Sequence, residues 1–142
     1  MGDRISVVLP CDLRYRDAVG AMIQQVCTRL EHEGAEPGLG HQVISAFNEA
    51  FNNLSLHGED REHEAAVEVD LQLTAEQLAI EIRDQGEPFN YNEVAPPDLD
   101  ELPESGLGIF IMRSFMSEVH YAPRSDDSGK NRLRMIRDLR GA

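Results

Sequence analysis

The sequence predicts a two-layer α/β sandwich, and three observations carry this prediction. Two long segments, at about 13–32 and 39–57, repeat apolar residues at helical spacing. Several shorter segments alternate apolar and polar residues, which is typical of strands with one buried face. The order of these segments favours helices packed on one face of a mixed, mostly antiparallel sheet. With 142 residues, 41% of them hydrophobic, we expect a single domain over residues 1–142.

The N-terminal half of the chain predicts one strand and two helices. Residues 5–9 form a short apolar strand that Pro10 ends. Asp12 can cap the first helix, and a Gly- and Pro-containing break at 34–40 separates it from the second. The apolar positions of the two helices are Val19, Met22, Ile23, Val26 and Leu30 in the first, and Val43, Ile44, Phe47, Ala50, Phe51 and Leu54 in the second.

The C-terminal half predicts a hairpin, a long loop, a helix and two final strands. Residues 67–73 and 78–82 alternate in polarity around a turn at 74–77. Residues 84–106 are rich in Pro and acids, which predicts a lid-like loop over about 87–105. A third helix is expected at about 108–117, and strands at about 118–122 and 131–139 around a polar turn at 125–129.

Charge and composition exclude several classes of protein. The net charge of −13 argues against unaided nucleic-acid binding, which needs clustered Lys and Arg. We find neither an apolar run long enough for a membrane span nor a signal-peptide pattern at the N-terminus, so we expect a cytoplasmic protein. Cys11 and Cys27 match neither a disulfide framework nor a zinc pattern.

The first motif that carries chemistry lies on the second expected helix. Glu49, Asn53 and His57 are four residues apart, so they share one helix face. A carboxylate there can accept a proton from an attacking hydroxyl, and an amide oxygen can ligate Mg²⁺. The alternative is a solvated helix face that ends at a Gly cap, Gly58.

Two further motifs follow in the chain. Asp84 stands at a strand end, where its carboxylate can accept a hydrogen bond from an exocyclic amine such as that of adenine, and Gly86 leaves room for a ring. A plain Asp-x-Gly turn is the alternative. Gly106, Leu107 and Gly108 open the third helix, where backbone N–H groups can bind phosphates; the alternative is a flexible helix entry. Neither a Walker loop nor a Rossmann fingerprint is present.

Together the three motifs resemble the N-box and the two glycine boxes of the GHKL ATPases. The pattern Glu49-x-x-x-Asn53, Asp84-x-Gly86 and Gly106-x-Gly108 occurs in that order. The chain is most similar to the stand-alone anti-sigma-factor serine kinases, through His57-Gly58, through Phe89 after the Asp-x-Gly, and through the run from Gly106 to Val119. The likeness covers nearly the whole chain.

This resemblance implies a Bergerat-type α/β sandwich that binds ATP and Mg²⁺. It implies Glu49 as general base, Asn53 as Mg²⁺ ligand and Asp84 with Gly86 at the adenine. Gly106, Leu107 and Gly108 would line the phosphates, and His57 would shape the site. The implied partners are an anti-anti-sigma protein of the STAS type, phosphorylated on Ser, and a sigma factor. A homodimer is among the assemblies that the resemblance implies.

Three functions stay open on the sequence. The first is an active ATP- and Mg²⁺-dependent serine/threonine kinase that also sequesters a regulatory protein. The second is a non-catalytic module whose partner-binding face responds to a nucleotide. The third is the catalytic domain of a split histidine kinase, which would need a phosphoacceptor His on another chain. A hydrolase is poorly supported, because we find no nucleophile–base pair.

Overall fold

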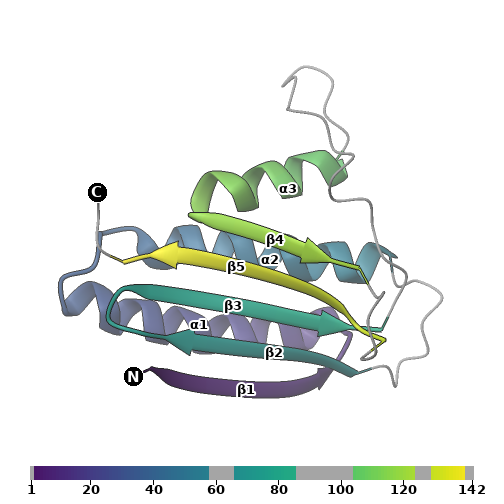
Figure 1. Ribbon diagram of the computed structural model, residues 1–142, viewed down its shortest axis with the longest axis horizontal. Coiled ribbons are helices and arrows are strands. Elements are labelled where there is room, and N and C mark those ends of the chain that lie inside the picture. Colours follow the sequence, from purple (N-terminus) through teal and green to yellow (C-terminus); the bar gives the residue numbers. More distant parts are fainter. Residues whose placement is uncertain (1, 58–65, 86–103, 124–128, 140–142) are drawn as a thin grey trace.

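The computed structural model describes residues 2–57, 66–85, 104–123 and 129–139 as one sheet covered by helices. In chain order the elements are β1 (Asp3–Pro10), α1 (Leu13–His32), α2 (Leu39–His57), β2 (Ala66–Leu73), β3 (Gln77–Asp84), α3 (Glu104–Phe115), β4 (Glu118–Ala122) and β5 (Asn131–Asp138). The strand order is β1-β2-β3-β5-β4, and every neighbouring pair is antiparallel (Figure 1). The expected two-layer sandwich is confirmed.

The core lies between the sheet and the three helices. In Figure 1, α1 and α2 run behind the strands, while α3 packs on α2 and beside β4. Buried side chains of all three helices, including Ile23, Phe47 and Met112, join those of the strands in one cluster. Within the parts of the chain that the structure describes, none of the helices is long and apolar enough to cross a lipid bilayer.

Two local signals in the sequence act as expected. Asp12 caps α1, where its Oδ1 accepts a hydrogen bond from the backbone N–H of Arg14 at 2.9 Å. Thr74 opens the turn between β2 and β3, and its N–H donates to the carbonyl of Gln77 at 2.9 Å.

Cys27 is fully buried in the core, and burial raises the pKa of its thiol to about 11. Cys27 is therefore a protonated packing residue.

The bounds of two elements differ from those expected. β1 begins at Asp3, because its antiparallel pairing with β2 extends to the Asp3–Leu73 pair. Arg4 also forms an ion pair with Asp70 of β2 at 2.7 Å. α3 begins at Glu104 rather than near 108, so packing against α2 overrides the low helix propensity of its glycines. It ends at Phe115, since the Ser117 N–H already donates to Ile136 of β5 at 2.7 Å.

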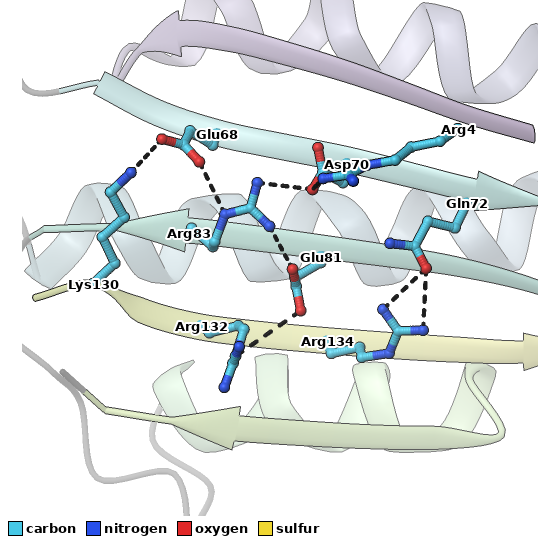
Figure 2. Close-up of polar contacts among 9 residues, drawn as sticks. All are labelled: Arg4, Glu68, Asp70, Gln72, Glu81, Arg83, Lys130, Arg132 and Arg134. Carbon is cyan, nitrogen blue, oxygen red and sulfur yellow. Dashed lines mark hydrogen bonds and ion pairs between the residues drawn. The ribbon is translucent and has the colours of Figure 1, made fainter. Parts of the chain in front are cut away.

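The outer face of the sheet, away from the helices, carries a network of charged side chains centred on Arg83 (Figure 2). Its guanidinium contacts Glu68 at 2.9 Å, Asp70 at 2.7 Å, and also Glu81. Asp70 is only 1% exposed. Burial raises the pKa of Asp70, but hydrogen bonds from neighbours that include Arg4 and Arg83 outweigh it and hold the pKa below its ordinary value. The network links the N-terminal part of β2 to the C-terminal part of β3.

We expect Arg83→Met to lower the free energy of unfolding by about 1–2 kcal/mol at pH 7. The lowered pKa values of Asp70 and Glu68 mean that folding stabilises their charged forms. This stabilisation is complete above the unfolded pKa, about 4, and is lost as pH falls through the lower folded values. Urea denaturation should therefore show that the difference in free energy of unfolding between wild type and Arg83→Met becomes smaller below pH 4. Arg29→Met, which removes an exposed pair with Glu33, is the control. If the difference in free energy of unfolding between wild type and Arg83→Met were the same at pH 3 as at pH 7, the stabilisation by Arg83 would not come from its ion pairs.

Candidate functional site

Helix α2 presents Glu49 and Asn53 on the side that faces α3. Phe47, Ala50 and Phe51 are fully buried and fasten the helix to the sheet. Asn53 is 3% exposed, and Glu49, one turn earlier, is partly buried. The four-residue spacing thus places a carboxylate and an amide together at the edge of the core, as the sequence predicted.

Gly108 of α3 lies directly against these two residues. A Cβ atom added at Gly108 would come within 2.8 Å of Glu49 Oε2 and 3.7 Å of Asn53 Oδ1. Gly108 is buried inside the helix, and its φ is not positive. A side chain at Gly108 would therefore displace the Glu49 carboxylate, and this conflict comes from the close approach of α3 and not from backbone conformation. The first and third motifs meet at this point.

The side-chain amide of Asn53 can still donate a hydrogen bond. Its Nδ2 is buried and lacks a hydrogen-bond partner in the described structure. An unpaired buried amide is costly unless a ligand satisfies it. Rotating the amide by half a turn would offer its oxygen instead, and an amide oxygen suits Mg²⁺. Among the described residues, no group of three His, Cys, Asp or Glu side chains is placed to hold a metal ion.

Asp84 forms the second part of the site, at the end of β3. It is 3% exposed and lies opposite Asn131 of β5 in the sheet register. Asn131 is 1% exposed, and its Nδ2 donates to Asp84 Oδ2 at 3.5 Å. The pair offers a carboxylate acceptor and an amide on the buried face of neighbouring strands. Sequence reasoning missed Asn131, although an Asn in an otherwise apolar buried alternation was a usable signal.

The remaining expected site residues are placed only in part. Gly106 and Leu107 lie in the first turn of α3, where backbone N–H groups lack partners within the helix, so they can still serve phosphates. Gly108 lies beyond that turn, which corrects the expectation that both glycines precede the helix. His57 is the last residue of α2, but its side chain lies outside the described residues, as do Gly86, Phe89 and the lid-like loop up to residue 103.

One comparison decides the family. Residues 10–137 match the family model described as a histidine kinase-like ATPase domain. The chain belongs to this family. The match takes in α2, the end of β3 and α3, so the elements that carry Glu49, Asp84 and Gly108 all lie inside it.

Relatives of the chain include bacterial kinases and anti-sigma factors. It is 24% identical to the serine-protein kinase RsbW of Bacillus velezensis over 125 residues, which cover 82% of this chain and 76% of that protein. It is 31% identical to the serine/threonine-protein kinase BtrW of Bordetella bronchiseptica and 33% identical to the anti-sigma F factor of Bacillus thuringiensis. These two matches cover 54% and 55% of this chain, and 57% and 56% of those proteins.

Solved structures share the fold. The SiaB–SiaC complex of Pseudomonas aeruginosa contains a chain that superposes with a TM-score of 0.66 at 16% identity, over 95% of this chain and 89% of that one. The structure of the RsbU and RsbW domains of Rv1364c from Mycobacterium tuberculosis matches with a TM-score of 0.59 at 16% identity, over 99% of this chain and 34% of that one.

Proposed function

We propose that the protein is an ATP- and Mg²⁺-dependent protein serine/threonine kinase that acts as an anti-sigma regulatory factor. The observation that carries this proposal is the meeting of Glu49, Asn53 and Gly108. They come from two helices that the β2–β3 hairpin separates in the sequence, yet a Cβ at Gly108 would touch Glu49 and nearly reach Asn53. A general base, a metal ligand and a close backbone approach are what phosphoryl transfer needs at one place.

In this proposal Asp84 and Asn131 hold the adenine. The Asp84 carboxylate accepts a hydrogen bond from the exocyclic amine, and Gly86 leaves room for the ring beside the strand end. The buried Asn131 amide orients the carboxylate through the bond at 3.5 Å. The triphosphate then extends toward the first turn of α3, where the N–H groups of Gly106 and Leu107 bind it.

Glu49 receives the proton of the attacking serine hydroxyl as the phosphoryl group is transferred. Its carboxylate lies beside α3, next to the place where the γ-phosphate would sit. Asn53 would hold Mg²⁺ through its side-chain oxygen, and the chemistry supplied by this ion would be positive charge beside the phosphates of ATP. Close contact with Gly108 fixes the position of Glu49, which favours transfer over non-productive geometries.

The partners in this proposal follow from the names of the relatives together with the resemblance of the three motifs to those of the anti-sigma-factor serine kinases. Two relatives are named serine or serine/threonine kinases and a third an anti-sigma factor. We therefore propose that the protein phosphorylates a serine of an anti-anti-sigma protein of the STAS type and sequesters a sigma factor in the cytoplasm. A homodimer is the assembly we propose to test first.

We expect wild type to bind ATP in a Mg²⁺-dependent manner, and Asp84→Asn to weaken this binding at least about tenfold. The substitution keeps the shape but replaces the charged acceptor with an amide that can donate. Guanine carries an oxygen where adenine carries its amine, so the ratio of ATP affinity to GTP affinity should also be smaller in Asp84→Asn than in wild type. Isothermal titration calorimetry with ATP and GTP, with and without Mg²⁺, measures both effects.

Asp138→Asn is the matched control. Asp138 is an exposed carboxylate at the opposite end of β5, where it accepts a hydrogen bond from Gln77 at 3.3 Å. Binding by this variant should equal that of wild type. Equal ATP affinity in Asp84→Asn would contradict the assignment of the adenine site. A folded wild-type protein that binds no ATP would overturn the proposed kinase and leave the non-catalytic binding module.

A further inference from the structure

We propose that the outer face of β5 and β4 docks an extended acidic segment of a partner protein, through Arg132 and Arg134. This surface lies on the side of the sheet away from the helices (Figure 2), whereas the side chains of Asp84 and Asn131 are buried. The inference stands on charge and geometry at this face alone, and it does not depend on the proposed kinase activity.

A hollow in this face has the shape of a binding site. It has a volume of about 420 Å³ and is lined by Glu81, His120, Tyr121, Ala122, Arg132 and Arg134. The sheet register places Ala122 opposite Arg132 and His120 opposite Arg134. Because Ala122 is small, it leaves space beside the Arg132 guanidinium.

The guanidinium groups of Arg132 and Arg134 make weaker contacts with carboxylates than those of Arg4 and Arg83 on the same face. Arg83 and Arg4 each bind Asp70 at 2.7 Å. Among the described residues, Arg132 makes one ion-pair contact, with Glu81 at 4.0 Å, and its side chain is 50% exposed. Glu81 is itself bound to Arg83.

Among the described residues, Arg134 differs from Arg132 in that it forms no ion pair with a carboxylate. Within the described ranges its guanidinium bonds only the neutral amide oxygen of Gln72, at 3.3 Å from each of two nitrogens. A guanidinium has five donors arranged to bind carboxylates through two bonds at once. The hollow is therefore locally basic in a chain whose net charge is −13.

The spacing of the two arginines identifies the occupant. Arg132 and Arg134 are two residues apart on one strand, so their stems are separated by about 6.5–7 Å on the same face. Alternate side chains of an extended peptide have the same separation. A segment with acidic residues at alternate positions, lying along β5, would place one carboxylate on each guanidinium. Arg is enriched at protein interfaces, where complementary charges fix the register of the partner.

The test is a ¹⁵N NMR titration of the full chain with an acetylated Thr-Glu-Thr-Glu-Thr peptide. We expect saturable shifts at the Arg132 and Arg134 side-chain N–H signals and at the backbone amides of β4 and β5. Arg132→Gln/Arg134→Gln should weaken the binding about tenfold, since two charged bonds are lost. Arg14→Gln/Arg29→Gln removes the same charge from exposed positions on α1 and should change it less than about twofold. Unfolding curves of both double variants establish that they are folded.

Several outcomes would overturn the proposal. Equal weakening in both double variants would show that only net charge matters. Equal binding of a peptide with two adjacent glutamates, or of the glutamine version of the peptide, would contradict the carboxylate spacing. Shifts caused by inorganic phosphate or a single-stranded oligonucleotide, but not by the peptide, would assign the hollow to a different ligand. Shifts that depend on protein concentration without peptide would assign this face to a second copy.

Discussion

Replacing Glu49 with Gln is expected to lower the rate of phosphoryl transfer by about 10²–10⁴-fold, because the hydroxyl of the acceptor serine loses its base. Gln keeps the length of the side chain and its contact with Gly108, where the carboxylate lies 2.8 Å from the Cβ position. ATP affinity should change less than about twofold, since the base acts on the acceptor and not on the nucleotide. Transfer from labelled ATP to purified anti-anti-sigma proteins, together with calorimetry of ATP binding, separates the two effects.

Glu118→Gln is the control for this experiment, because Glu118 is an exposed carboxylate on β4 whose described partner is His120. Its transfer rate should equal that of wild type. A Glu49→Gln variant that transfers phosphate at the normal rate would remove Glu49 from the chemistry. A variant that no longer binds ATP would instead assign Glu49 to holding the nucleotide.

Local patterns allowed most of the fold to be predicted from the sequence. Helical periodicity in α1 and α2 and alternation in β2 and β3 each lie within one segment, and so does the Asp12 cap, so they are visible without tertiary information. The pairing of Glu49 with Asn53 is also local, because both lie on one helix. What the sequence could not show is that Gly108 would meet them.

The missed features depend on contacts between distant segments. Asn131 lies at the candidate site only because β5 inserts between β3 and β4 and pairs Asn131 with Asp84. The early start of α3 depends on its packing against α2, which propensity alone does not contain. Similarly, the sequence places Arg132 and Arg134 two residues apart in a segment with several positive charges. Only the sheet register shows that Arg132 lies opposite Ala122 of β4.

Replacing Gly108 with Ala is expected to lower phosphoryl transfer about a hundredfold while leaving the protein folded. The added Cβ would lie 2.8 Å from Glu49 Oε2, so the carboxylate has to move, and a displacement of about 1 Å in a reacting group has effects of this size. The cost in stability is small, because the obstructed atom is the end of a flexible side chain. The higher helix propensity of Ala adds about 0.5–1 kcal/mol in compensation.

Gly20→Ala provides the matched control, since it makes the same change inside α1. Within the described parts of the chain, a Cβ at Gly20 would meet only Asn48 Oδ1 of α2, at an ordinary distance of 3.9 Å. We expect this variant to gain about 0.5–1 kcal/mol in free energy of unfolding and to keep full transfer activity. Thermal unfolding and transfer rates measured side by side on both variants distinguish loss of geometry from loss of fold. Normal activity in Gly108→Ala would mean that the approach of α3 to Glu49 does not set the position of the base, because the displaced carboxylate would still serve the reaction.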